Sequence, residues 1–479
     1  MEKKIVINPV TRIEGHAKVT IRLDEDGSID TARLHVVEFR GFERFVQGRF
    51  YWEVPVIVQR LCGICPISHL LCAAKATDVI VGVDKLTPVA EKMRRLMHFG
   101  QVFQSHALHF FHLSAPDLVF GFDAPPEKRN VIALAKENKE LAYRAIMMRK
   151  YGQEIIKATA GKKIHGNGAI PGGINKNLTI EERDAFVKDI DTMIQWAQEG
   201  LDLYKGIYRA DLERLASFGS YESNYVSLVR PDGALELYDG LLRAKDREGK
   251  LIFDGVQPAD YLDYIREGVR SWSYMKFPFI YSLGQEAGWY RVGPLARLNN
   301  CDFIDSALAE QERQEFQALG AGRPVHATMA YHWARLIETL HAAEKIKELL
   351  GDPDLQGTDL VVRGERRNEA VAIIEAPRGT LFHHYRINDN DQVERANLIV
   401  STTSNNEPMN KAVDRVARDF LVGVEITEGL LNHIEVAIRA FDPCLSCATH
   451  AVGNMPLVVR LVDHQGNMVD EKTRGARVA

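Results

Sequence analysis

The sequence is poor in cysteine, in long apolar runs and in charge of one sign, and each absence excludes a class of protein. Its 479 residues include only six cysteines, too few for a disulfide-dense secreted scaffold. No apolar stretch approaches the roughly 18–20 residues that span a bilayer. The 60 basic and 65 acidic residues form no long run, which argues against a nucleic-acid surface or a polybasic membrane tether. The opening "MEKKIVINPV" lacks an apolar h-region, so we expect no secretory signal.

Two further absences concern architecture and cofactors. The chain has no Pro/Ser/Gly-rich linker, internal repeat or low-complexity run. A single intertwined unit therefore fits as well as the two or three domains that the length suggests. The stretch "GNGAIPGG" (166–173) has the glycines of a phosphate loop but not their G-x-x-x-x-G-K-[ST] order, and no G-x-G-x-x-G follows a strand. We therefore expect no flavin or nicotinamide site on this chain.

The apolar periodicity predicts a mainly α fold with small β portions (α+β) and long central helices. Strands are expected over about 3–40, with "DEDGS" as a hairpin signal. A helical core is expected over about 86–350, where apolar residues recur every three to four positions. A C-terminal α+β portion is expected over about 360–450, with strands in "EAVAIIEAP" and "ANLIV" and a helix in "EITEGLLNHIEVAIRAF".

Four of the six cysteines form two C-x-x-C pairs. Cys62 and Cys65 lie in "RLCGICPISHLLC", and Cys444 and Cys447 lie in "FDPCLSCATH". C-x-x-C is the shortest spacing that lets two thiolates bind one metal, so two pairs predict a four-sulfur site. The alternative is a structural zinc, but zinc ribbons usually separate their pairs by about 12–20 residues. These pairs lie near opposite ends of a large chain, which favours a metal that the fold exists to hold.

The other two cysteines are single. Cys72 and Cys301 are far apart in the sequence, whereas a cubane iron–sulfur cluster usually takes four cysteines. We therefore expect no iron–sulfur cluster on this chain. Electrons released at the metal site would leave through a partner.

The motifs together resemble those of one family. In order along almost the whole chain they are "RIEGH", "RGFERFVQGR", "RLCGICPISH", "SHALHFFHLSAPD", "YRVGPLAR", "EAPRGTLFHH" and "DPCLSCATH". This set resembles the large, catalytic subunit of nickel–iron hydrogenases, and "HVVEFRGFERFVQGR" is most similar to the soluble, bidirectional, NAD-linked branch. The resemblance implies a cytoplasmic enzyme that reversibly splits dihydrogen, joined to flavin/NAD diaphorase subunits through an iron–sulfur small subunit.

The resemblance also implies the metal ligands. Cys62 and Cys444 would be terminal on nickel, and Cys65 and Cys447 would bridge to an iron that carries carbon monoxide and cyanide. Splitting dihydrogen into hydride and proton needs a soft, electron-rich metal and a nearby base. Thiolates are soft donors, and a terminal thiolate can itself accept the proton.

Four further residues match catalytic positions of the family. Glu14 in "RIEGH" matches a proton-relay glutamate beside Cys444, and burial by the metal site would raise its pKa towards neutrality. Arg378 in "EAPRGT" would place a permanent cation over the open side of the metal pair. Asp117 and Asp442 match acidic residues that would anchor Arg378 and its surroundings.

The remaining matches concern the environment of the centre and a second metal. Pro377 flanks Arg378, His69 could donate a hydrogen bond to a bridging sulfur, and Thr402 or Thr403 matches a hydroxyl donor to cyanide, with Thr402 preferred. The second metal is a magnesium ion, whose implied ligands are the side chains of Glu43 and His450 and the backbone carbonyl of Leu398.

The end of the chain allows two interpretations. The resemblance implies one domain over 1–450 and a C-terminal extension, 451–479, that a dedicated endopeptidase removes after His450 once nickel is loaded. An ordinary edge strand is the alternative for this tail.

Two alternative functions remain for the chain as a whole. They are a metal-free subunit like the quinone-site subunit of complex I, which lacks the four thiolates, and a structural zinc protein.

Overall fold

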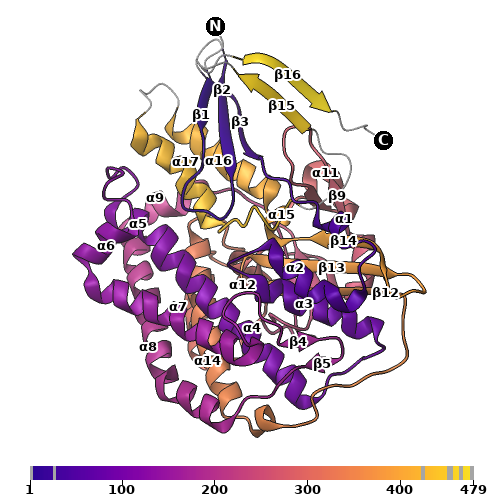
Figure 1. Cartoon of the computed structure of the whole chain (residues 1–479). Coiled ribbons are helices and arrows are strands. Elements are labelled where there is room, and N and C mark those ends of the chain that lie inside the picture. The colour runs from indigo at the N-terminus through magenta and orange to yellow at the C-terminus, as the bar shows by residue number, and fades with distance from the viewer. Residues whose placement is uncertain (1–3, 25–27, 422–426, 450–456, 463–467, 475–479) are drawn as a thin grey trace.

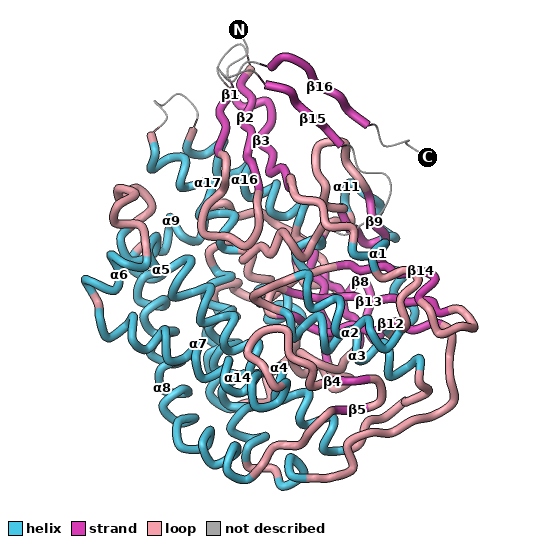
Figure 2. Tube along the Cα trace, viewed as in Figure 1, coloured by secondary structure: helices cyan, strands magenta, loops and turns pink. Residues whose placement is uncertain are grey.

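The computed structural model describes residues 4–24, 28–421, 427–449, 457–462 and 468–474. Strands gather toward the top and right of the view in Figure 2, and helices fill the left and the base. The N-terminal strands form an antiparallel sheet in the order β1-β2-β3, and alternate side chains of β2 and β3 are buried. The strands predicted at the N-terminus, and their pairing across "DEDGS", are confirmed. The strands are β1 (Lys4–Ile7), β2 (Ala17–Leu23) and β3 (Ile29–Val36).

Long helices make up the body of the molecule (Figure 1). The Thr87 hydroxyl accepts a hydrogen bond from Ala90 N and so caps α4, while Thr179 and Glu182 form a capping box at the start of α8. Helices α4, α7, α8 and α14 pack against one another around a buried apolar core. The predicted central helices are α4 (Pro88–Ala107), the π-helical turn η3 (Leu108–Ser114), α5 (Ala115–Phe120), α6 (Val131–Glu137), α7 (Lys139–Ala160), α8 (Ile180–Ala210), α9 (Leu212–Ser217), α13 (Ala307–Ala318) and α14 (Ala330–Leu350).

Strands interrupt the helical core expected over about 86–350, between 224 and 291. This segment forms a four-stranded sheet in the order β11-β6-β7-β8 and a separate β9–β10 pair. In β6 five of six side chains are buried, so the strand lacks the polar–apolar alternation that marks a half-exposed one. The elements are β6 (Asn224–Val229), β7 (Leu241–Lys245), β8 (Leu251–Val256), β9 (Ile265–Gly268), β10 (Phe277–Ile280), β11 (Tyr290–Arg291) and the helix α12 (Pro294–Asn300).

The C-terminal α+β portion has the predicted strands and helix. Its sheet has the order β12-β13-β14 and packs on α3. The strands are β12 (Glu369–Ala376), β13 (Gly379–Ile387) and β14 (Val393–Ile399), and the helices are α15 (Ser401–Ser404), α16 (Asn406–Phe420) and α17 (Glu428–Ala440). Beyond 450 the structure describes the hairpin β15 (Leu457–Val462) and β16 (Met468–Arg474).

Short elements complete the fold. They are α1 (Phe42–Phe45), η1 (Tyr51–Glu53), α2 (Val54–Val58), η2 (Gln59–Leu61), α3 (Pro66–Ile80), β4 (Ala169–Ile170), β5 (Gly173–Ile174), η4 (Pro258–Asp260), α10 (Tyr261–Tyr264), η5 (Tyr281–Leu283), α11 (Gly284–Ala287) and η6 (Pro353–Gln356).

The core draws on both ends of the chain. The largest buried apolar cluster runs from Ile7 to Ala448, and a second cluster holds all four C-x-x-C cysteines between α3 and the β12–β14 sheet. No helix among the described residues is long and apolar enough to cross a membrane. The predicted class, mainly α with small β portions, is confirmed.

Candidate metal centre

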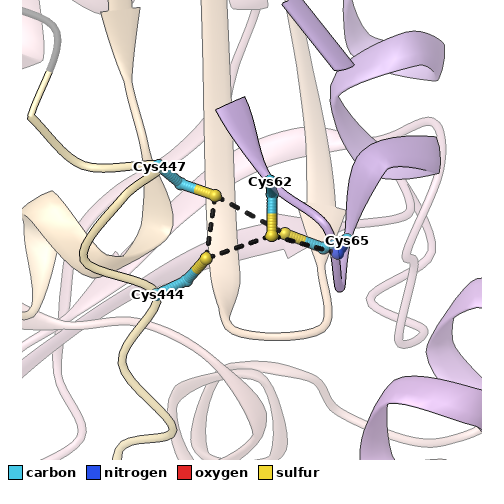
Figure 3. Close-up of side chains that lie close together, drawn as sticks. All are labelled: Cys62, Cys65, Cys444 and Cys447. Carbon is cyan, nitrogen blue, oxygen red and sulfur yellow. Dashed lines mark hydrogen bonds between the residues drawn. The ribbon is translucent and has the colours of Figure 1, made fainter. Parts of the chain in front are cut away.

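The four cysteines of the two C-x-x-C pairs come from two loops that face each other (Figure 3). Cys62 ends η2 and Cys65 is the residue before α3, which begins at Pro66. Cys62 Sγ accepts hydrogen bonds from the backbone N–H groups of Ile64 and Cys65, each at 3.2 Å. Cys444 and Cys447 lie in the loop after α17, so one pair opens a helix and the other follows one.

The four sulfur atoms form one compact buried group. Cys62 Sγ lies 3.2 Å from Cys444 Sγ, Cys444 Sγ lies 2.8 Å from Cys447 Sγ, and Cys447 Sγ lies 3.8 Å from Cys65 Sγ. All four side chains are buried, and all four sulfurs lie within 4.8 Å of one another. The sequence prediction that the two distant pairs make one four-sulfur site thus agrees with the geometry.

The electrostatics of the four thiols are uneven. Burial raises the pKa of Cys444 and Cys447 well above the usual range of a thiol. Hydrogen bonds from Cys444 and Cys447 lower the pKa of Cys65 to about 6. At Cys62, burial raises the pKa of the thiol, but hydrogen bonds from the neighbouring thiols and the positive charge of Arg378 outweigh burial, so the pKa is lowered. Negative charge is favoured on the first pair, and a divalent cation among the four would favour thiolate at all of them.

The donor set and its surroundings fit a soft metal centre. Four convergent thiolates bind nickel, iron or zinc better than hard cations. Three of the cysteines also line a small cavity on one side of the group, whereas a closed structural zinc site leaves no open position. The cavity is lined by Cys65, Cys444, Cys447, His69, Pro377, Arg378, Val400, Ser401, Thr402, Ala376 and Leu381.

Glu14 lies where the sequence prediction requires. Its Oε2 is 3.1 Å from Cys444 Sγ and accepts a hydrogen bond from Ser446 N at 3.0 Å. The backbone is fixed as well, because Leu445 N donates to Glu14 O at 3.0 Å. Gly15 has φ +85°, and a Cβ there would come within 2.8 Å of Leu445 Cβ, so glycine is needed for this approach. Glu14 is only partly buried, less than its predicted burial by the metal site.

Arg378 lies on the turn between β12 and β13 and faces the cavity. Its Nε donates to Asp442 O at 2.7 Å and its Nη2 to Asp442 Oδ1 at 2.9 Å. Burial disfavours the guanidinium charge, but Asp442 and the nearby thiolates outweigh it and raise the pKa of Arg378 well above its usual range. Burial raises the pKa of Asp442 to about 6 against the opposing effect of Arg378. The predicted anchoring of Arg378 by Asp442 is therefore present.

The turn that carries Arg378 is itself fixed. Gly379 has φ +136°, and a Cβ there would lie 2.4 Å from Val292 Cγ2. Buried Arg297 donates to the carbonyls of Ala376 and Pro377 at 3.0 and 3.2 Å. Pro377, which flanks Arg378, lines the cavity.

Asp117 does not anchor Arg378, which corrects that expectation. Its Oδ1 pairs with Arg12 at 2.5 Å and its Oδ2 with Arg439 at 2.8 Å, and no described contact joins it to Arg378. Asp117, in α5, instead joins Arg12 of the "RIEGH" segment to Arg439 of α17. Asp117 thus supports the segment that carries Glu14.

Two neighbours of the cavity differ in their contacts. His69 Nδ1 lies 3.3 Å from His383 Nε2, and the predicted hydrogen bond to a cysteine sulfur is not among the described contacts. Because α3 starts at Pro66, His69 lies one turn along it, facing β13. Thr402 Oγ1 accepts from Cys444 N at 2.9 Å and Thr402 lines the cavity. Thr403 Oγ1 instead donates to Ala448 O.

The predicted magnesium ligands lie partly together. Glu43 Oε1 accepts from Leu398 N at 2.9 Å, so the carboxylate and this backbone segment are adjacent. His450 lies outside the described residues. Lys276 Nζ is 3.7 Å from Glu43 and 3.0 Å from Glu267 Oε2, a lysine and a glutamate that the sequence did not single out.

Several other residues near the centre were missed. Ser446 binds Glu14 through its N–H, and Arg439 contacts the segment just before Glu14. A usable signal existed for Arg439: Asn432, Glu435 and Arg439 recur at helical spacing along α17 and are all buried. The four cysteines are the only such metal-ligand cluster found among the described residues.

Family models match most of the chain. A model described as nickel-dependent hydrogenase matches residues 40–126 and 237–450, and a model described as HoxL-like matches residues 4–39. Both cysteine pairs lie within the first match.

Curated relatives match over nearly their full length. The chain is 49% identical to the NAD-reducing hydrogenase HoxS subunit beta of Cupriavidus necator, over 99% of this chain and 100% of that protein. It is 42% identical to a chain of the F420-non-reducing hydrogenase of Methanothermobacter thermautotrophicus, over 97% and 99%.

Solved structures agree. A crystal structure of an NAD+-reducing [NiFe]-hydrogenase in the H2-reduced state superposes with a TM-score of 0.92 at 56% identity, covering 94% of this chain and 99% of that one. The Ni-Fe-Se hydrogenase of D. vulgaris Hildenborough has a TM-score of 0.75 at 24% identity over 94% and 100%, a likeness of fold alone.

Proposed function

Because this chain belongs to the nickel-dependent hydrogenase family, we propose that it is the catalytic subunit of a nickel–iron hydrogenase that reversibly splits dihydrogen into protons and electrons. Family membership confirms the resemblance inferred from the motifs and the assignment as an oxidoreductase acting on hydrogen. The observation that carries the proposal is the placement of a carboxyl group at one thiol of the four, Glu14 Oε2 being 3.1 Å from Cys444 Sγ.

The side chains around the four thiols have different proposed roles in the reaction. A nickel–iron centre would supply the soft, electron-rich metal that polarises and splits dihydrogen, held by Cys62, Cys65, Cys444 and Cys447. Cys444 Sγ is placed to take up the proton, and Glu14 accepts it at Oε2 over 3.1 Å. Arg378 keeps a permanent positive charge at the cavity, where it stabilises developing negative charge. Asp442 holds that guanidinium in place through two hydrogen bonds.

Small diatomic ligands on the iron, carbon monoxide and cyanide, belong to the proposal. The cavity beside Cys65 and Cys447 offers a mixed lining for them: Pro377 and Val400 are apolar, whereas Arg378 and the hydroxyls of Ser401 and Thr402 are polar. The polar groups suit cyanide nitrogen and the apolar ones suit carbon monoxide.

Electrons would leave through an iron–sulfur small subunit. The loop between Cys62 and Cys65 reaches the surface, since Gly63 is exposed and Ile64 partly so. Cys72 and Cys301 are buried and single, and the described residues hold no second cysteine cluster. Since the relative in C. necator is NAD-reducing, we take NAD as the final acceptor, reached through flavin-containing diaphorase subunits.

A magnesium ion at Glu43 is a further part of the proposal. The carboxylate lies beside the Leu398 backbone, and carboxylate, carbonyl and water oxygens suit this ion. Lys276 provides a competing positive charge at 3.7 Å, so the site would need its third ligand, His450, to favour the ion.

Metal analysis of the purified, active complex tests the function. We expect nickel associated with this chain at about one atom per chain, with iron beyond what the partner's clusters account for, and hydrogen-dependent reduction of NAD. Metal analysis of this chain after separation from its partner subunit gives its iron content without the iron of the partner's clusters. Zinc alone would support the structural alternative, and a metal-free chain in a complex that does not consume hydrogen would support the complex I-like alternative.

The C-terminal extension, 451–479, is proposed to be removed by an endopeptidase directly after His450. Cleavage would free a new carboxy-terminus at His450, which would then fold inward beside the proposed nickel and magnesium sites. Intact mass spectrometry of the active, nickel-loaded chain should give a mass that ends at His450. A mass that includes 451–479 in turnover-competent protein contradicts the proposal and favours the edge-strand alternative.

A further inference from the structure

We propose that Arg439 is a positioning residue that sets the place of Glu14, acting through Thr11 directly and through Arg12 by way of Asp117. The inference rests on the proposed role of Glu14 as proton acceptor from Cys444. Arg439 lies in the last turn of α17, just before the loop of Cys444 and Cys447. It therefore ties the element that supplies one cysteine pair to the segment that supplies the base.

Every donor of the Arg439 guanidinium is used. Its Nε donates to Thr11 O at 3.0 Å and one Nη2 hydrogen to Thr11 Oγ1 at 3.0 Å. The remaining hydrogens go to Asp117 Oδ2 at 2.8 Å, Asn432 Oδ1 at 3.0 Å and Glu435 Oε2 at 2.8 Å. A guanidinium has five N–H donors in a rigid plane, and here all five are satisfied while the side chain is 2% exposed.

The acceptors of Arg439 in turn hold the same segment. Glu435 Oε1 accepts from Thr11 N at 2.6 Å. Asp117 uses its other oxygen to bind Arg12, whose Nη1 also donates to Leu113 O at 2.8 Å. Arg12 has φ +53°, a left-handed conformation that a non-glycine residue adopts only when its surroundings hold it. Residues 11 and 12 are thus fixed on the side of α5 and α17.

The other end of the segment is fixed at the cysteine loop. Leu445 N binds Glu14 O at 3.0 Å, and Glu14 pairs with Cys444 as a parallel bridge. Only one residue, Ile13, separates the two anchorages. A shift of Thr11 and Arg12 toward solvent is therefore transmitted to Glu14, whose Oε2 must stay near Cys444 Sγ for a direct proton transfer. Misplacing a reacting group by about 1 Å can lower a rate by about 10²-fold.

A different role for Arg439, as a buried ion pair that only stabilises the fold, makes another prediction. Such a residue would change the amount of folded, metal-loaded protein but not the rate per nickel. The chain offers a matched control in Arg94, which is fully buried and makes a two-pronged ion pair with Asp78 at 2.6 and 3.0 Å. Arg94 has no described contact with the cysteines, with Glu14 or with the segment before it.

The experiment is a double-mutant cycle on the complete complex, with rates expressed per bound nickel. We expect Arg439→Lys to lower hydrogen turnover by at least about 10-fold, within the 10²-fold cost of a 1 Å misplacement, because an ammonium cannot serve five acceptors in one plane. In the Glu14→Gln background the same change should have no further effect on the residual rate. Arg94→Lys should leave the rate per nickel within about two-fold of wild type.

The results distinguish a failure of the Arg439 proposal from a failure of the proposed role of Glu14. If the factors of Arg439→Lys and Glu14→Gln multiply, or if Arg439→Lys turns over at the wild-type rate, Arg439 does not act through Glu14 and the proposal is wrong. If Glu14→Gln itself is fully active, the proposed function of Glu14 fails instead, which the single variant reveals. Should Arg439→Lys not fold, Thr11→Val takes its place with the same criteria, since it removes only the hydroxyl that Arg439 and Glu435 share.

A second measurement needs no turnover. Amide hydrogen exchange of the segment 10–16, followed by mass spectrometry on the full chain from nickel-depleted cells, should be faster in Arg439→Lys than in wild type. Arg94→Lys should leave this segment unchanged. Unaltered exchange of 10–16 in Arg439→Lys shows that the guanidinium does not hold the segment and overturns the proposal.

Discussion

Glu14→Gln is expected to lower hydrogen turnover by about 10² to 10⁴-fold, the usual contribution of a positioned acid–base group, while nickel and iron content stay at the wild-type level. The amide keeps the shape of the side chain and can still accept from Ser446 N, as the carboxylate does at 3.0 Å. It cannot take a proton from Cys444. The proton then remains at the thiol, and exchange of hydrogen isotopes with water should fall with turnover.

Arg378→Lys provides the comparison that assigns this effect to proton transfer. Replacing the planar fork would lower the rate by about 10²-fold, the loss associated with one preorganised electrostatic donor. That loss concerns the splitting of dihydrogen, so it should not raise the solvent isotope effect, whereas Glu14→Gln should. Near-normal isotope exchange with water in Glu14→Gln would show that protons leave by another route.

The sequence could predict the metal ligands because their chemistry is local. The C-x-x-C spacing lets the thiols of Cys62 and Cys65 bind the same metal ion. Only the approach of Cys444 and Cys447 to this pair depends on the fold. The contact of Glu14 with Cys444, which joins residues 430 positions apart, came from resemblance and not from spacing.

What the sequence could not predict depends on contacts between distant segments. Asp117 pairs with Arg12 and Arg439, and no described contact joins it to Arg378. Nothing in the spacing of these residues distinguishes one arginine partner from another. His69 likewise faces His383 across α3 and β13, a choice that follows from where β13 packs.

The strands between 224 and 291 were missed for a different reason. The short strands β6 and β7 are buried on both faces. A buried strand reads as a short apolar run without period, which helix and strand share. Edge or half-exposed strands such as β2 and β3 keep their alternation and were predicted.

Cys447→Ser is expected to abolish hydrogen turnover and to leave neither nickel nor iron on the chain. A serine hydroxyl is a hard donor that stays protonated, whereas the proposed bridge needs a thiolate shared by both metals. Cys447 is fully buried and lies within reach of both Cys444 and Cys65, at 2.8 and 3.8 Å between sulfur atoms. Metal analysis and hydrogen-uptake assays of the purified complex measure both losses.

Serine variants of three other cysteines make the test of Cys447 more specific. Cys301→Ser and Cys72→Ser replace buried thiols that donate hydrogen bonds to backbone carbonyls, Leu298 O for Cys301 and Ala372 O and Leu381 O for Cys72. Neither thiol belongs to the four-sulfur cluster, so both variants should keep their nickel and iron. Cys62→Ser, at a proposed terminal ligand, should lose nickel but keep iron, because both proposed bridging thiolates remain. Full nickel and iron occupancy in Cys447→Ser would remove the bridging assignment. Equal loss of both metals from Cys62→Ser would show that terminal and bridging thiols cannot be told apart by their position in the two pairs.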